Sequence, residues 1–235
     1  MANLRGPLGP VLLLLLYLNA GPALAIPLAS PVFINEFHYD NDGADSGEFV
    51  ELAGPGGTDL AGWQLLLYNG STASPYGQVD LTGVLADDTG TGFGFHLIGF
   101  ASNGLQNGAA DGLALLDDAG MVREFLSYEG VLTAVAGGAA GLTSRDVLVS
   151  ETNATPIGAS LQRVGQGGVA TDFVWMALRQ GTPGYRNNDQ LLVAGPVGLS
   201  IGMPWPLWLT GLLWLVLRGG RTTWPYRQLP GMNMA

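Results

Sequence analysis

Four carboxylate side chains crowd into one short stretch of the sequence: Asp40, Asp42, Asp45 and Glu48. Calcium in proteins takes about six to eight oxygen ligands, and closely spaced carboxylates supply them. The spacing departs from the EF-hand loop, because Asp45 stands where that loop has its glycine. These four residues are the candidate calcium ligands of the sequence. The alternative is a solvated turn, since Asp, Asn and Gly favour turns for backbone reasons alone.

The two histidines, His38 and His96, fall in different predicted strands. A zinc hydrolase or a metal-dependent nuclease uses more nitrogen ligands or an oriented general base. Each histidine is therefore expected to be a strand residue with a satisfied ring. The sequence has no cysteine, no Gly-x-Ser-x-Gly elbow and no P-loop, so no catalytic residue is predicted. The enzymatic alternative is a calcium- or magnesium-dependent hydrolase that combines His38 with the four acidic residues.

Short alternating segments surround these residues and predict β-strands. In one of them Val50 and Leu52 share a face and Glu51 takes the other, and in another Trp63 shares a face with two leucines. The predicted strands are 32–39, 48–52, 60–68, 78–82, 93–100, 113–116, 121–128, 160–164 and 173–177.

Turn sequences such as Asn69-Gly70 separate the strands, and no long amphipathic helix pattern interrupts them. Strands at this spacing predict an all-β fold, an antiparallel β-sandwich over residues 26–190. Trp63 and Trp175 are expected in its core. Val122, Leu126 and Tyr128 are expected on one face of their strand. The Ala/Gly-rich stretch 131–142 is expected to be a flexible loop.

Acidic residues dominate this region. All 19 lie between Glu36 and Asp189 with only five arginines, which leaves a formal charge of −14. Such a surface repels phosphate backbones, so no nucleic-acid partner is expected, whereas divalent cations or basic partners would be attracted. Glu36 and Glu51 are expected to be partly exposed strand charges. The alternatives are cation ligands or ion pairs with Arg163 or Arg179.

The two ends of the chain have the character of targeting segments. Residues 1–25 combine an early arginine, an apolar run and an Ala-x-Ala site, which predicts a secretory signal peptide cleaved after Ala25. Residues 191–217 contain no charge and are long enough for a membrane-spanning helix. Arginines in the tail 218–235 would stay cytoplasmic, so we expect an exported, membrane-anchored protein with its main domain extracytoplasmic. A buried strand pair is the alternative for residues 191–217.

Several ordered motifs resemble the bacterial lamin-tail domain. They are Phe33–Leu52, Asp59–Leu65, Gly112–Val122, Ser160–Arg163, Asp172–Trp175, Thr182-Pro183-Gly184 and Asn187. The resemblance covers about residues 33–188 and implies an immunoglobulin-like sandwich used as an extracellular accessory module. The C-terminal segment, with Met203-Pro204-Trp205-Pro206 and an arginine cluster, resembles a degenerate PEP-CTERM sorting signal that lacks the acidic residue between the prolines.

These features together predict a non-catalytic binding module, tethered to the membrane or cell surface, whose partner is a protein or surface component. Binding sites lie on loops held by a rigid scaffold, so stretches 40–48 and 131–142 are the expected contact regions. The alternatives are the metal-dependent hydrolase or accessory subunit of a secreted nuclease, and a structural subunit of a surface assembly.

Overall fold

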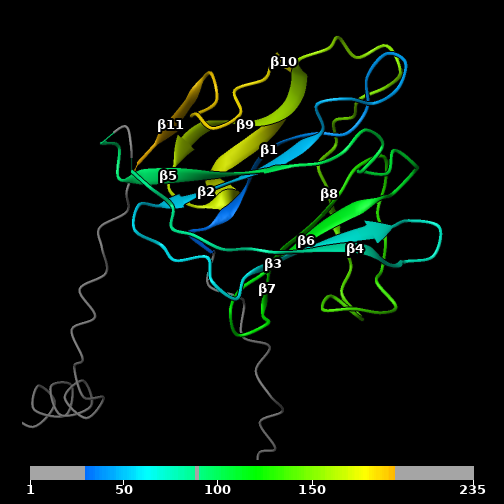
Figure 1. Cartoon of the computed structure of the whole chain (residues 1–235), viewed down its shortest axis with the longest axis horizontal. Helices are drawn as coiled ribbons and strands as arrows, with labels where there is room; N and C mark the ends of the chain where they lie inside the picture. The colour runs from blue at the N-terminus through cyan, green and yellow to red at the C-terminus, as the bar shows by residue number, and fades with distance from the viewer. Residues whose placement is uncertain (1–29, 88–89, 194–235) are drawn as a thin grey trace, which may run out of the picture. The chain divides into compact units, whose positions relative to one another are not determined.

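The computed structural model describes residues 30–87 and 90–193, which form an all-β sandwich of two sheets (Figure 1). The first sheet has the order β10 (Phe173–Gln180), β9 (Ala159–Gly167), β1 (Phe33–His38), β2 (Phe49–Pro55) and β5 (Phe93–Gly99), with β11 (Gln190–Leu192) paired to β9. The second sheet has the order β4 (Ser74–Asp80), β3 (Gln64–Asn69), β6 (Gly112–Leu116), β7 (Val122–Ser127) and β8 (Arg145–Asp146). A 3₁₀ turn, Ala170–Asp172, precedes β10.

All nine predicted strands are present, with ends shifted by a few residues. Neighbouring strands run antiparallel except for β11 beside β9 and β8 beside β7. These two parallel strands were not predicted from the sequence. They contain three and two residues respectively, too few to show an alternating pattern.

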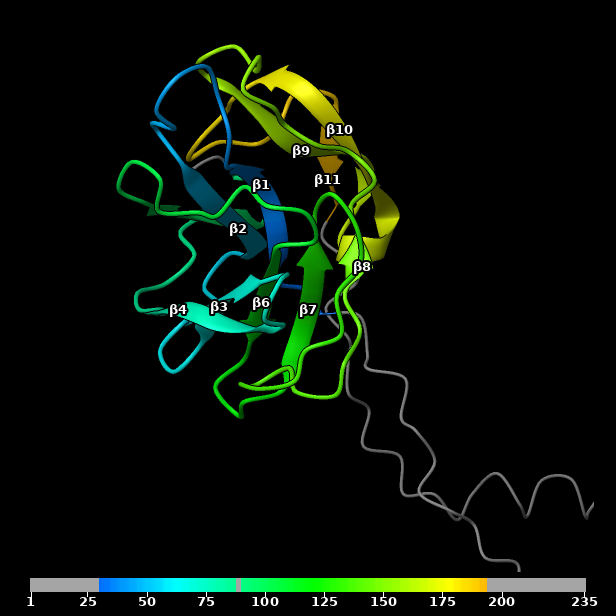
Figure 2. The same cartoon turned by 90° about the vertical axis from the view of Figure 1, so that its right-hand side faces the viewer.

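The two sheets lie as separate layers (Figure 2). The main hydrophobic core contains side chains from both sheets. Val50 and Leu52 of β2 share this core with Leu65 and Leu67 of β3, which confirms the predicted faces. Trp175 is buried in the same core, and Trp63 packs against it while partly buried. Alternation therefore sets which side chains of β2 and β3 enter this core. Strands β1, β2 and β6 are nevertheless buried on both faces.

Val122 does not share a face with Leu126 and Tyr128 as predicted. Leu126 and Tyr128 belong to the core between the sheets, whereas Val122 packs on a smaller apolar cluster on the other face. A β-bulge explains the difference, because Leu115 pairs with Glu124 and the next residue of β6 pairs with Val122. One extra residue in a strand reverses the faces beyond it.

Stretch 131–142 is a loop, as predicted, but it is anchored on the second sheet rather than free. Its residues Leu132, Ala134 and Ala139 are buried in the smaller cluster. Tyr68 of β3 donates its hydroxyl to Ala136 O (2.9 Å) and accepts the N–H of Ala139 (3.0 Å). The loop thus covers the outer face of the second sheet.

β10 forms one edge of the first sheet and exposes a row of apolar side chains, Val174, Met176 and Leu178. The pairing with β9 shifts register between Met176 and Arg179. Leu178 takes a φ of 52°, in the left-handed region. The bulge therefore bends this edge near its end.

The predicted signal peptide, most of the predicted anchor and the basic tail lie outside the described residues. Leu191 and Leu192, placed in the anchor by the sequence, belong to β11, and Val193 donates its N–H to Gly167 O (2.8 Å). The sandwich therefore continues past residue 190. Within residues 30–87 and 90–193 no helix is long and apolar enough to cross a membrane.

Candidate functional site

Two segments far apart in the sequence meet at one end of the first sheet: the connection 39–48 between β1 and β2, and residues 151–158 before β9. We call them together the loop end. The Glu151 carboxylate accepts the backbone N–H groups of Tyr39 (2.7 Å) and Asp40 (3.1 Å). The Tyr39 hydroxyl accepts the N–H of Glu151 (2.8 Å) and donates to Glu129 (2.9 Å). These bonds fix the two segments against each other.

His38 lies at the base of the loop end and is almost fully buried. Its Nδ1 is 2.9 Å from Glu151 Oε1, and its Nε2 is 2.9 Å from Asn41 Nδ2. Asn41 Nδ2 also donates to Ser46 O (2.8 Å), which fixes the amide orientation, so Nε2 accepts and Nδ1–H donates. The predicted satisfied ring is confirmed for His38, and neither nitrogen is left for a substrate.

Burial lowers the pKa of His38, but Glu151, together with Ser46 and Glu48, outweighs burial, so the pKa is raised overall. His96 lies on β5, opposite Leu52 of β2, and there burial alone lowers the pKa. The structure therefore places the two histidines in different electrostatic surroundings, as their separate strands imply.

The four predicted metal ligands do not form one group. Asp40 and Asp45 lie against each other. Glu48 accepts the N–H groups of Gly104 (2.8 Å) and Leu105 (3.0 Å), so it holds a neighbouring loop. Asp42 is exposed. In the part of the chain that the structure describes, no three Asp, Glu or His side chains are grouped to hold a metal ion.

The Asp40 carboxyl sits in an unfavourable place for a negative charge. Burial raises its pKa to about 6, and the nearby Asp45 adds to the shift. Asp45 Oδ1 accepts the N–H of Asn41 (3.2 Å), and its Oδ2 accepts Nδ2 of Asn107 (3.1 Å). These hydrogen bonds hold the Asp45 carboxylate close to Asp40.

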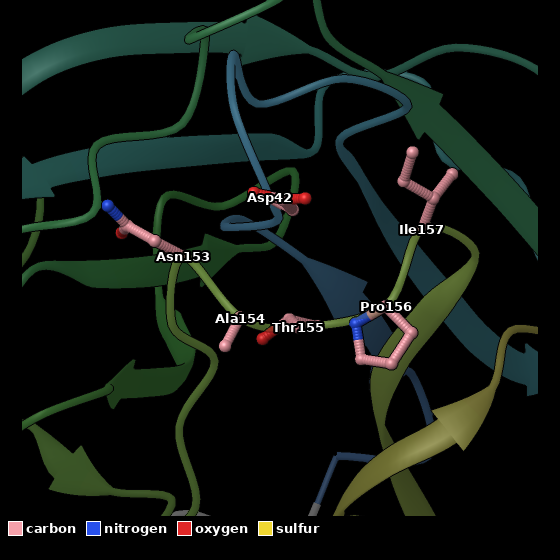
Figure 3. Close-up of a pocket in the computed structure, with 6 residues that line it drawn as sticks. All are labelled: Asp42, Asn153, Ala154, Thr155, Pro156 and Ile157. Carbon is pink, nitrogen blue, oxygen red and sulfur yellow. The ribbon is translucent and has the colours of Figure 1, made fainter.

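Two cavities open at the loop end. The larger, about 540 Å³, is shown in Figure 3. It is lined by Asp42, Asn153, Ala154, Thr155, Pro156 and Ile157. The second, about 350 Å³, lies between His38, Ser46, Phe49 and Pro183 and shares Ile157 with the first. Ile157 is 76% exposed, so an apolar side chain stands in the open between two cavities.

Glu36 and Glu51 were predicted to be partly exposed, and this prediction is wrong because both are fully buried. Glu36 accepts the hydroxyls of Ser160 (2.6 Å) and Thr182 (2.7 Å) and the N–H of Thr182 (2.8 Å). Glu51 accepts the N–H of Gly184 (2.5 Å) and Nδ2 of Asn35 (3.1 Å). Residues 181–190, here the closing segment, thus cover both carboxylates.

The alternative partners predicted for these glutamates lie elsewhere. Arg163 is fully buried and pairs with Glu124 (2.5 Å), and Arg179 pairs with Asp189 (2.5 Å). Burial raises the pKa of Glu51 to about 8, since the hydrogen bonds from Asn35 and Gly184 offset burial only in part. The glutamates act as anchors for the closing segment.

Sequence reasoning missed Glu151, Asn41 and the segment around Ile157. Glu151 stands in a stretch without strand alternation, and its partners His38 and Tyr39 lie 112 or 113 positions earlier. No local pattern signals such a contact. Asn41 was visible inside the acidic stretch, but turn chemistry alone explains an asparagine there.

Comparisons of the chain with protein-family models, with curated proteins and with solved structures each found no match.

Proposed function

We propose that this chain is an exported, non-catalytic binding module of the lamin-tail type, immunoglobulin-like, tethered by its C-terminal segment and binding a protein or surface component through the loop end. One observation carries the proposal. Two cavities meet at the exposed Ile157 on segments that Glu151 and Tyr39 hold together. Ordered loops on a rigid scaffold are where binding residues concentrate.

The chemistry of the loop end favours a partner with both apolar and basic groups. Ile157 and Pro156 offer apolar surface, and Asp42 lines the same cavity (Figure 3). An exposed apolar group ringed by polar groups is typical of interaction surfaces. The negative charge of the region adds long-range attraction for a basic partner and repels nucleic acid.

Export and tethering are supported by the sequence of the two ends, which fits a signal peptide and an uncharged anchor followed by arginines. The main domain is then periplasmic or on the cell surface, so protease added to intact cells, or to cells whose outer envelope is permeabilised, should digest the sandwich and spare the tail. Digestion only after the inner membrane is broken would contradict an extracytoplasmic location.

Site-specific photo-cross-linking of the full chain in its native cells tests the binding surface. A photoreactive side chain at Ile157 should capture one discrete envelope component. The matched control is Val84, which is 55% exposed and lies near Gly57, at the opposite end of β2 from the loop end. Equal capture from both positions, or none from Ile157, would contradict a binding role for the loop end.

A further inference from the structure

Two side-chain oxygens in the acidic stretch are buried and have no hydrogen-bond partner among the described residues: Asp40 Oδ1 and Asn41 Oδ1. Only 4% of Asp40 is exposed, and Asn41 is fully buried. Buried polar groups in folded proteins are paired as a rule, so two adjacent unpaired acceptors require a donor or a cation.

The orientation of Asn41 is fixed by its neighbours. Its Nδ2 donates to Ser46 O at 2.8 Å and lies 2.9 Å from His38 Nε2. A backbone carbonyl accepts only from a donor, so the amide nitrogen must be on this side. The amide oxygen consequently faces away from Ser46 and stays without a partner. The hydrogen bond from His38 to Glu151 (2.9 Å) in turn leaves Nε2 as an acceptor for Asn41.

The Asp45 carboxylate completes a group of acceptors. It is bound to the N–H of Asn41 (3.2 Å), and the Asp40 carboxyl lies against it. Each carboxylate oxygen has two lone pairs, so Asp45 keeps acceptor capacity after its bonds to Asn41 and Asn107. Asp40 Oδ1 and Asn41 Oδ1 thus lack donors, and Asp45, which lies against Asp40, can still accept.

Arginine does not supply the missing positive charge. The arginine ion pairs among the described residues are made with Asp117, Glu124 and Asp189, none of which belongs to the acidic stretch. Two neighbouring carboxyl groups without a counter-ion repel each other, and a cation from solution removes that repulsion.

We propose that Asp40, Asn41 and Asp45 bind one calcium ion, with water completing its coordination. Carboxylate and amide oxygens in irregular geometry suit calcium, whereas magnesium demands a near-octahedral site. Asp42 and Glu48, predicted as ligands from the sequence, are not part of this group. Glu48 is engaged with Gly104, and Asp42 lines the neighbouring cavity. The proposal does not rest on the binding role, because it concerns this chain and calcium alone.

Thermal unfolding of the full chain, purified in mild detergent and freed of metal, tests the site. Calcium chloride at a hundredfold excess over its dissociation constant should raise the midpoint by about 5–10 °C. Magnesium chloride at the same concentration should raise it much less. Terbium luminescence sensitised by nearby aromatic rings, and quenched by added calcium, gives a readout that does not depend on stability.

Asp40→Asn and Asp45→Asn should each abolish the calcium-induced shift and the terbium signal. Asp42→Asn is the matched control, because it makes the same charge change in the same stretch at an exposed position, and it should keep both. If Asp45→Asn does not fold, Asp40→Asn decides alone. No shift and no terbium signal in the unmodified chain would overturn the proposal. Loss of both in Asp42→Asn, or an equal shift with magnesium, would do the same.

Discussion

One pair of acidic side chains, Glu36 and Glu51, lies within the paired strands β1 and β2. A second pair, Asp40 and Asp45, lies in the connection between these strands, and its surroundings differ. Glu36 and Glu51 sit beneath the closing segment, and every one of their carboxylate oxygens accepts a hydrogen bond. Asp40 and Asp45 are also buried, yet Asp40 Oδ1 has no partner in the described part of the chain. Burial alone therefore does not distinguish an anchor from a ligand site, whereas the supply of donors does.

The unpaired atoms near the glutamates are of another kind. They are the neutral amide oxygens of Gln162 and Gln190. A neutral acceptor without a partner costs less than a buried charge does. The donors around Glu36 and Glu51 come from neighbouring strands and from the closing segment, so removing either carboxylate should loosen that segment.

The largest effect is expected for Glu36→Ala. The substitution leaves the buried hydroxyl of Ser160 and the part-buried donors of Thr182 without their acceptor, so it should lower the free energy of unfolding by about 3–5 kcal/mol. Urea unfolding of the full chain measures it. Asp80→Ala, which removes an exposed carboxylate on β4, is the control and should cost under about 0.5 kcal/mol. Equal losses in the two variants would contradict an anchoring role.

A pH-dependent effect of intermediate size is expected at Glu51. Its pKa is raised from 4.5 to about 8 in the folded protein, so the folded state holds the proton more tightly than the unfolded state. The stabilisation is complete below about pH 4.5 and is lost as the pH rises through 8. The unfolding free energy of the unmodified chain, minus that of Glu51→Gln, should fall across this window by at most about 1.4 kcal/mol per pH unit. A difference that does not change with pH would contradict the assignment.

The substitution Asp40→Asn, measured in calcium-free buffer, tests the difference between the two pairs. The change removes a charge that repels Asp45 and adds a donor, so it should raise the free energy of unfolding by about 1 kcal/mol. Glu36→Gln should instead lower the free energy of unfolding, because Thr182 and Ser160 donate hydrogen bonds to the carboxylate. If both variants shift stability in the same direction, the distinction between the pairs does not hold.

The smallest effect is expected for Asp42→Ala, which should change the free energy of unfolding by less than about 0.5 kcal/mol, since the side chain is exposed. If the loop end binds a basic partner, the same change should weaken that binding and its dependence on salt. A large stability loss would show that Asp42 has a structural role that its exposure does not indicate.

Local patterns predicted most of the sandwich, because alternation over a few residues is enough to define a strand and its buried face. Local patterns failed where contact with a segment distant in the sequence determines whether a side chain is buried. The burial of Glu36 and Glu51 depends on the closing segment. Thr182, which belongs to that segment, lies 146 positions after Glu36. The clustering of Asp40 and Asp45 could be predicted from the sequence. Their separation from Glu48 could not, because it depends on hydrogen bonds from Gly104 and Leu105 to Glu48.

The bulge near the end of β10 has a consequence for encounters between copies of this chain. An exposed edge with Val174, Met176 and Leu178 is the kind of strand on which a neighbouring copy can add its own strand. The left-handed Leu178 and the shifted register break the regular row of backbone donors and acceptors that such an addition needs. The irregular end of β10 therefore disfavours sheet extension between two copies that meet along this edge.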